Sequence, residues 1–163
     1  MKKTRQAKNQ MAKAKKLFTI GYEQSNAQDF FDALTGAKVA TLVDVRAVAA
    51  SRRPGFSKRQ LAAGLDAHGM AYVHLQKLGT PKEGRLAARS GHAERMLEIY
   101  ERHLATPEAQ HALEELTALA KSGRPLCLLC YERDPAHCHR QRLAAELHKR
   151  LGVKVENLFC APV

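Results

Sequence analysis

Side chains that could do chemistry are concentrated in one segment of this 163-residue sequence, residues 130–140, which reads CYERDPAHCHR. A thiolate is a nucleophile and a metal ligand, and a carboxylate can act as a general acid or base. Cys138 is expected at or near a helix N-terminus, where free N–H groups and the helix dipole favour the thiolate form of a cysteine. The segment therefore predicts Cys130, Cys138 and Glu132 as catalytic candidates.

A second group of reactive side chains follows an apolar run earlier in the chain. Asp44 and Arg46 end the run LVDVR, and two more arginines follow in the next loop. Asp44 is a fourth catalytic candidate, as a general acid or base. Guanidinium groups together with a helix N-terminus are suited to bind an anion. The predicted anion- or substrate-binding residues are Arg46, Arg52, Arg53, His74, His139 and Arg140.

Simpler roles remain open for several of these residues. Asp44 and Arg46 could form an internal salt bridge that ties two loops together. Cys130 could be a small buried hydrophobic residue at a strand end. His137 and His139 could be surface residues at the start of a helix.

Two specific kinds of site can be tested against the spacing. A phosphatase or sulfurtransferase loop needs about five residues between Cys and Arg so that backbone amides surround the anion. Nine residues separate Cys130 from Arg140 and two separate it from Arg133, so that loop is excluded. Zinc could bind Cys130, Cys138 and His139, but Cys130 and Cys138 do not have the spacing of a CxxC pair, two of the ligands are adjacent, and no fourth ligand is obvious. No metal ligand is therefore assigned, and zinc stays a less favoured cofactor.

The elements that must position these residues alternate between short apolar runs and segments of helical period. This alternation is typical of parallel strands joined by crossover helices. Strands are expected at 17–21, 40–45, 71–75, 125–130 and 153–158. The predicted fold class is α/β: an open, mostly parallel five-stranded sheet with helices on both faces, a three-layer arrangement of the Rossmann or flavodoxin type. The order of the strands is not predicted.

The helices have recognisable start signals. Ser25 with Gln28, and Ser57 with Gln60, have the spacing of capping boxes. Thr106 followed by proline predicts a further helix start, and another helix is expected to begin at Cys138 or His139. Residues 76–91 contain three glycines and are expected to form a long functional or mobile loop.

The parallel topology predicts where the reactive side chains meet. Ligands of open α/β sheets bind in the crevice outside the carboxyl ends of the strands. Asp44 and Arg46 follow the second predicted strand, and Cys130 and Glu132 follow the fourth. These four residues are therefore expected in one cleft.

The charge is unevenly distributed along the chain. The formal net charge is +11, and residues 1–16 hold seven of the 27 basic residues and no acid. The remaining chain has 20 basic and 16 acidic residues and is only mildly basic. We predict a basic N-terminal arm at 1–16 and a single α/β domain at 17–163. The arm could bind a phosphate backbone by counterion release or be a solvated tail.

Composition limits the class of protein. No apolar run approaches the roughly 20 residues that cross a bilayer. The basic N-terminus is not followed by the apolar segment of a secretory signal. Four cysteines are too few for a disulfide framework in a chain of this length, and free thiols are expected in a reducing compartment. The expected location is the cytoplasm, with no membrane partner.

Five short motifs in this order resemble a known family, the domain of unknown function 488. They are Thr19-Ile-Gly21, Asp44-Val-Arg46, the segment SRRPGFS at 51–57, Tyr72-Val-His74 leading to Leu78-Gly79, and Cys130-x-Glu132 with Cys138-His-Arg140. The resemblance covers roughly residues 17–159. Tyr22-Glu23 stand where the family commonly has His-Ser, and Thr80-Pro81 stand where many members have Gly-Arg. The resemblance implies a site and no established reaction.

The leading hypothesis is an enzyme that acts on a phosphate-bearing substrate, a nucleotide or a nucleic acid, at the carboxyl edge of the sheet. One alternative is a nucleic-acid binding module without catalysis, although aromatic residues are only 6% of the chain and Trp is absent. A second alternative is a metal-binding or redox-sensing thiol protein that uses Cys130 and Cys138.

Overall fold

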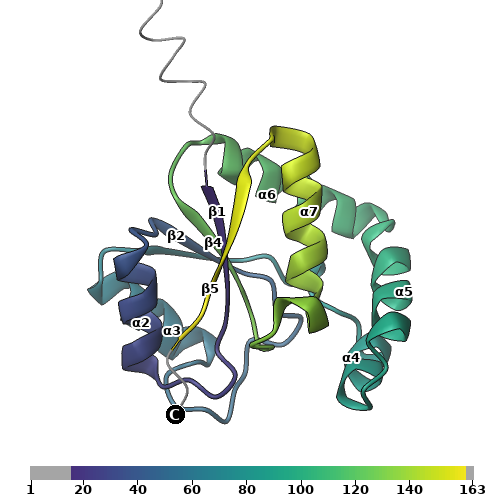
Figure 1. The fold of residues 1–163 in the computed structure, drawn as a ribbon, viewed down its shortest axis with the longest axis horizontal. Coiled ribbons are helices and arrows are strands. Elements are labelled where there is room, and N and C mark those ends of the chain that lie inside the picture. Colours follow the sequence, from purple (N-terminus) through teal and green to yellow (C-terminus); the bar gives the residue numbers. More distant parts are fainter. Residues whose placement is uncertain (1–15, 161–163) are drawn as a thin grey trace, which may run out of the picture.

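Five parallel strands form the centre of the protein (Figure 1). The computed structural model describes residues 16–160. The strands are β1 (Lys16–Gly21), β2 (Thr41–Asp44), β3 (Ala71–His74), β4 (Leu126–Cys130) and β5 (Lys154–Leu158). Each predicted strand is confirmed to within one residue at either end. The predicted basic arm lies outside the described residues except for Lys16, which begins β1 and forms an ion pair with Glu156 of β5.

The strand order is β3-β2-β4-β1-β5. β4 therefore lies in the middle, paired with β2 on one side and β1 on the other. All five residues of β4 are buried, as the continuous apolar run LCLLC requires. Because the carboxyl ends of all five strands lie at one edge, Cys130 ends the strand at the centre of that edge.

Helices cover both faces of the sheet, so the predicted three-layer α/β fold is confirmed. They are α2 (Ala27–Gly36), α3 (Lys58–Ala67), α4 (Lys82–Arg89), α5 (Ala93–Leu104), α6 (Pro107–Lys121) and α7 (His139–Leu151). Two short 3-10 helices are η1 (Gln76–Leu78) and η2 (Pro135–His137). On one face α2 and α3 pack against residues such as Ile20, Leu42 and Leu129. On the other face α4, α5, α6 and α7 pack against residues such as Val43 and Leu128.

Neither predicted capping box forms. The N-cap of α2 is Asn26, whose side chain accepts a hydrogen bond from the Asp29 N–H at 2.8 Å, while Ser25 is buried. Ser57 is the N-cap of α3, but its hydroxyl bonds to Ser51 across the preceding loop. In both cases the loop before the helix offers the serine a position or partner that sequence spacing does not reveal. The start signal at Thr106 is confirmed, with its hydroxyl oxygen accepting from the Ala109 N–H.

The loop expected at 76–91 is instead largely helical. It contains η1 and the eight-residue helix α4. A Cβ at Gly84 would lie 2.5 Å from Thr80 Cγ2, so the glycine here permits close packing of the helix. This correction matters for the site because α4 carries Arg85 and Arg89 to the carboxyl edge of the sheet.

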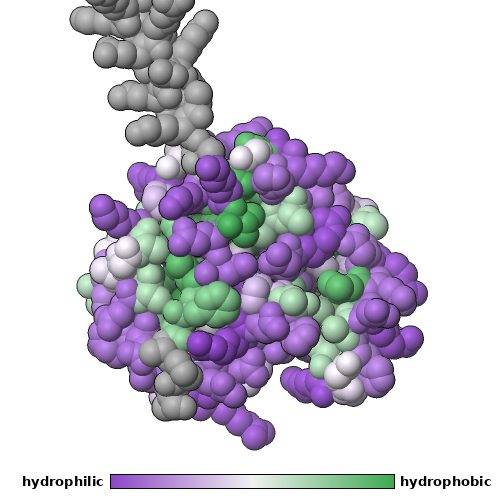
Figure 2. All heavy atoms as spheres, viewed as in Figure 1, coloured by the Kyte–Doolittle hydropathy of each residue, from purple (hydrophilic) through white to green (hydrophobic). Residues whose placement is uncertain are grey.

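Most of the surface in Figure 2 is hydrophilic, with a hydrophobic patch over the edge strand β5. The outline is notched between α4 and the body of the protein, at the carboxyl edge of the sheet. Within residues 16–160, no helix has the length and apolar character needed to cross a membrane.

Candidate functional site

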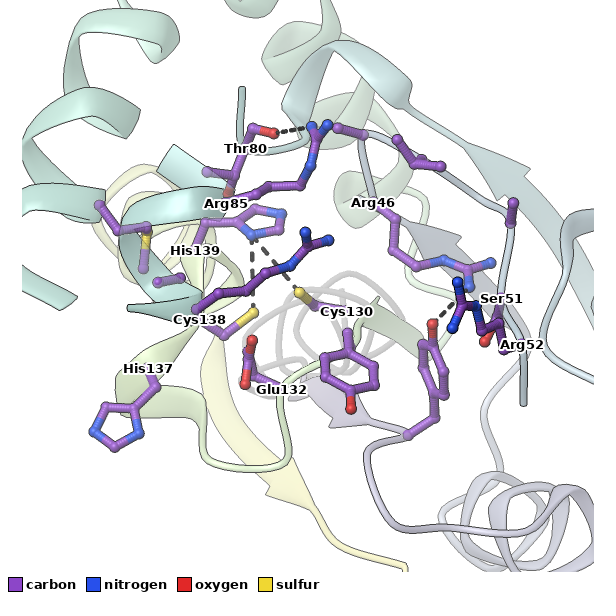
Figure 3. Close-up of a pocket in the computed structure, with 18 residues that line it drawn as sticks. Arg46, Ser51, Arg52, Thr80, Arg85, Cys130, Glu132, His137, Cys138 and His139 are labelled. Carbon is purple, nitrogen blue, oxygen red and sulfur yellow. Dashed lines mark hydrogen bonds between the residues drawn. The ribbon is translucent and has the colours of Figure 1, made fainter. Parts of the chain in front are cut away.

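A cavity of about 530 Å³ opens at the carboxyl edge of the sheet. The helix after β1, α2, covers one face, and the helix after β4, α7, covers the other, so the loops diverge and leave a crevice. The cavity is lined by Tyr22, Arg46, Ala47, Val48, Ala50, Ser51, Arg52, Thr80, Arg85, Ala88, Arg89, Met96, Cys130, Tyr131, Glu132, His137, Cys138 and His139. Figure 3 shows the thiols and His139 on one side and Arg46, Ser51 and Arg52 on the other.

Asp44 and Arg46 form a bidentate salt bridge beneath the cavity. Arg46 Nε lies 2.9 Å from Asp44 Oδ1, and Arg46 Nη2 lies 2.7 Å from Asp44 Oδ2. Tyr72 Oη donates a hydrogen bond to Asp44 Oδ2 at 2.5 Å, and Arg46 Nη1 donates to the Phe56 carbonyl at 2.7 Å. Both oxygens of Asp44 are thus occupied, and Asp44 itself is fully buried.

Asp44 shifts the pKa of its partner Arg46 and of its neighbour Tyr72. Burial lowers the pKa of Arg46, but the hydrogen bond and charge of Asp44 outweigh burial and raise the pKa above its ordinary value. Burial and the Asp44 carboxylate together raise the pKa of the Tyr72 hydroxyl. Asp44 and Arg46 are joined by two parallel hydrogen bonds, so this is the internal salt bridge that the sequence had left open.

Three soft ligand atoms meet on the floor of the cavity. Cys130 Sγ lies 3.7 Å from His139 Nδ1, and Cys138 Sγ lies 3.8 Å from the same nitrogen. The three side chains are buried, and their ligand atoms all lie within 4.8 Å of one another. Cys138 is the extended N-cap of α7 and His139 its first residue, and this change of backbone direction lets two adjacent side chains reach one point.

A backbone carbonyl fixes the tautomer of His139. His139 Nε2 lies 2.7 Å from the Val45 carbonyl oxygen, which can only accept, so Nε2 carries the proton. In the neutral ring Nδ1 is then an acceptor. Its lone pair faces both sulfur atoms (Figure 3).

The two thiols have opposite acidity. Cys130 is hydrogen-bonded to Cys138, and this bond together with burial raises the pKa of Cys130 well above its usual range. Burial opposes ionisation of Cys138 as well, but the hydrogen bond from Cys130 and the positive charge of Arg140 hold the pKa of Cys138 well below its usual range.

Arg140 lies behind this floor and does not line the cavity. Its Nη1 donates to the Glu132 carbonyl at 2.5 Å and its Nη2 to the Arg133 carbonyl at 3.2 Å. Arg140 is fully buried, and its Nε is the one buried side-chain nitrogen or oxygen in residues 16–160 without a hydrogen-bond partner. The guanidinium thus holds the loop after β4 and places a positive charge beside the thiols.

Glu132 is the one carboxylate among the described residues that line the cavity. It is half-buried, and its carboxylate points toward Cys138 in Figure 3. Burial, followed by the nearby charges of Glu23 and Cys138, raises the pKa of Glu132 to about 7. The group can therefore be protonated or ionised near neutral pH.

Three arginines face the cavity without an ion pair in the described part of the chain. Arg52 comes from the loop after β2, and Arg85 and Arg89 come from consecutive turns of α4. Arg85 donates to the Thr80 carbonyl at 2.8 Å, which orients the side chain but leaves its charge uncompensated. Their combined charge exceeds that of the single carboxylate.

Apolar side chains border the same space. Val48 and Tyr131 line the cavity although each is about half exposed, 52% and 46% respectively. The rings of Tyr131 and Tyr22 form a T-shaped pair with centroids 5.3 Å apart, and Tyr22 stacks on Phe56. Tyr131 is therefore packed against buried aromatic rings, while about half of its surface stays exposed.

Six of the ten predicted site residues line the cavity, namely Arg46, Arg52, Cys130, Glu132, Cys138 and His139. The expected single cleft is present: Arg46, Cys130 and Glu132 line it, and Asp44 lies directly beneath. Arg53 is directed elsewhere, with Nη1 donating to the Ser25 carbonyl at 2.8 Å. His74 Nε2 donates to the Arg46 carbonyl and supports the loop from outside the cavity.

Sequence reasoning missed Arg85 and Arg89 as site residues. They lie in the segment expected to be a loop, where their spacing of four residues has no meaning. In a helix that spacing places both side chains on one face. The spacing was therefore the signal, and it becomes visible only once residues 82–89 are read as a helix.

The chain was also compared with known proteins. Neither the curated proteins nor the solved structures give a match. A family model described as "Domain of unknown function DUF488" matches residues 26–147, a segment that runs from α2 into α7 and includes most of the cavity residues. Because this match spans most of the sequence, the chain belongs to the DUF488 family.

Proposed function

We propose that this protein is an enzyme that acts on a phosphate-bearing substrate, a nucleotide or one nucleotide unit of a nucleic acid, in the cavity at the carboxyl edge of the sheet. The observation that carries the proposal is the set of three arginines, Arg52, Arg85 and Arg89, that face one recessed space without an ion pair in the described residues. Guanidinium groups bind phosphate oxygens through two parallel hydrogen bonds.

The internal salt bridge separates two roles among the arginines. Arg46 is neutralised by Asp44 and already donates to Phe56 and Tyr22. We assign it a positioning role: it holds the loop that carries Arg52. The other arginines supply the positive charge that a phosphate group needs.

The size and the walls of the cavity suit a nucleoside. About 530 Å³ falls within the range of small-molecule sites, about 300–1,000 Å³. Tyr131 offers a half-exposed aromatic ring at the same cavity, and base stacking on an aromatic ring contributes about 1–3 kcal/mol. A phosphate at the arginines and a base at Tyr131 would use both features together.

Glu132 is the candidate for proton transfer because, within residues 16–160, it is the one acid that lines the cavity. No side-chain hydrogen bond or ion pair within residues 16–160 holds its carboxylate, so it is free to contact a substrate. The recessed position of Glu132 and the thiols favours catalysis over simple binding, because a module that only binds a nucleic-acid backbone needs an open basic face.

Binding is the first test. Affinity for a nucleoside monophosphate, a nucleoside and inorganic phosphate would be measured by calorimetry. Each arginine-to-phosphate contact contributes about 1.5–3 kcal/mol, so Arg52→Ala, Arg85→Ala and Arg89→Ala should each weaken nucleotide binding by about tenfold or more. Binding of the uncharged nucleoside should change little.

Arg124→Ala is the matched control, because Arg124 is an exposed arginine that precedes β4 at the opposite edge of the sheet. Glu132→Gln should leave binding intact and abolish turnover of any nucleotide substrate that the wild type consumes. An equal loss of affinity in Arg124→Ala would remove the basis of the proposal. So would unchanged affinity in a variant that combines the substitutions Arg52→Ala, Arg85→Ala and Arg89→Ala.

A further inference from the structure

The arrangement of Cys130, Cys138 and His139 is that of a metal centre with one open position. We propose that these three side chains bind a zinc ion on the floor of the cavity. Two thiolates and one imidazole are ligands that Zn²⁺ prefers, and a set of three protein ligands is typical of catalytic zinc sites. The sequence weighs against this site because two ligands are adjacent, and the backbone turn at Cys138 removes that objection.

The distances fit a tetrahedral ion. With Zn–S of about 2.3 Å and Zn–N of about 2.0 Å, the sulfur-to-nitrogen edge of a tetrahedron is about 3.5 Å. The two observed edges, from Cys130 Sγ and Cys138 Sγ to His139 Nδ1, are 3.7 and 3.8 Å. Small side-chain shifts therefore suffice to place an ion between the three atoms.

The hydrogen bonds of His139 point to the same conclusion. Nδ1 has one lone pair, which faces two sulfur atoms, so it can accept a hydrogen bond from only one of them. One ion satisfies all three atoms. The opposite nitrogen donates to the Val45 carbonyl, the outer contact that fixes the ring of a metal-binding histidine.

The charge around the cluster also permits a divalent ion. Zn²⁺ with two thiolates and a neutral imidazole has no net charge, so it adds no repulsion beside the buried guanidinium of Arg140. Because all three ligands line the cavity, the fourth position faces the space that Glu132 and the arginines border (Figure 3). A water or a substrate oxygen can occupy it next to Glu132.

The metal site stands on this geometry, whereas its part in turnover rests on the proposed function. Metal binding is therefore tested without substrate. The full-length protein would be purified under reducing, chelator-free conditions, and zinc would be measured by elemental analysis and cobalt by absorption spectroscopy. One ion per chain is expected, with a thiolate-to-cobalt charge-transfer band and the visible bands of tetrahedral cobalt.

Cys130→Ser, Cys138→Ser and His139→Ala each remove a ligand. Loss of an outer contact alone costs about 10- to 100-fold in metal affinity, so these variants should bind more than about 100-fold more weakly. Cys160→Ser is the matched control, since Cys160 is a buried thiol outside the cluster. Glu132→Gln should retain the ion, because Glu132 is not a ligand.

Two readouts protect the test against variants that fail to fold. Zinc added to the metal-free wild type should raise its melting temperature, and it should slow alkylation of Cys130 and Cys138 but not of Cys127, which is sealed inside β4. Wild-type protein that takes up no zinc or cobalt, or a Cys160→Ser variant that loses as much metal as Cys130→Ser, would overturn the proposal. If the wild-type protein takes up no metal but the arginine variants still lose nucleotide binding, the metal site is wrong and the proposed function stands.

Discussion

At the scale of single residues, the same chemical group has different uses according to its partners. Arg46, Arg52 and Arg140 were grouped by the sequence as anion-binding side chains. Arg46 is bound to Asp44, and Arg140 is bound to two carbonyl oxygens under the loop after β4. Of the three, only Arg52 faces the cavity with its charge uncompensated in the described structure. The residue type thus indicated where the site lies, and the hydrogen-bond and ion-pair partners of each arginine determine its role there.

The Asp44–Arg46 pair leads to a prediction about stability. Asp44→Asn keeps the shape of the side chain but leaves the Arg46 charge buried without a counter-ion, and removing one partner of a buried pair costs about 3–5 kcal/mol. We expect a loss of free energy of unfolding of about 3 kcal/mol, measured by urea denaturation. Asp66→Asn, at an exposed position of α3, is the control and should change stability by less than about 0.5 kcal/mol. An unchanged free energy of unfolding in Asp44→Asn would mean that the salt bridge contributes nothing to folding.

At the scale of elements, the end of β1 and the loop after β4 must approach closely for the site to form. A Cβ on Gly21 would lie 1.8 Å from the carbonyl oxygen of Glu132, the same oxygen that accepts from Arg140. Gly21 pairs with Cys130 in the parallel register, so it lies beside the strand end that carries the thiol. The Thr-Ile-Gly motif at the end of β1 thus has a steric reason for its glycine.

Replacement of this glycine should therefore damage fold and site together. Gly21→Ala forces the backbone at Glu132 to move, and overpacking of this kind costs about 1–3 kcal/mol. Gly36→Ala is the control, because nothing lies within 4 Å of the added Cβ at the end of α2. We expect a lower melting temperature and weaker metal binding in Gly21→Ala only. Equal melting temperatures for the two variants would show that the loop after β4 adapts without cost.

At the scale of the whole molecule, charge divides the chain into two parts. Residues 1–15 hold six basic residues, Lys2, Lys3, Arg5, Lys8, Lys13 and Lys15, and no acid. If they contact a nucleic-acid backbone, each released counterion adds about 0.9 to the slope of log K against log salt. Deletion of residues 1–15 should then reduce this slope by up to about five and weaken non-specific binding of DNA or RNA at low salt.

A full-length variant with these six residues changed to glutamine separates charge from chain length, and it should behave like the deletion. Unchanged affinity of both variants across the salt range would assign the arm no part in binding. The cavity arginines would be unaffected by either result, since they lie on the described domain at the carboxyl edge of the sheet.

Much of this molecule follows from its sequence because the signals are local. Strand boundaries, the helix start at Thr106 and the common edge for Asp44, Cys130 and Glu132 depend on apolar periodicity and on the parallel connection of successive strands. The family motifs lie at these strand ends, and the family match confirms the resemblance.

The strand order and the contacts within the site were decided by tertiary structure alone. Contacts between residues that are distant in the sequence produce no periodic pattern from which they could be predicted. The strand order puts β4 at the centre of the sheet. Long-range contacts determine that Arg46 is neutralised and that α4 brings two more arginines to the cavity. The convergence of Cys130, Cys138 and His139 depends on the turn of the chain at the start of α7, where an extended residue precedes the first helical one. The sequence determines which chemical groups are present, but packing determines the distances between them.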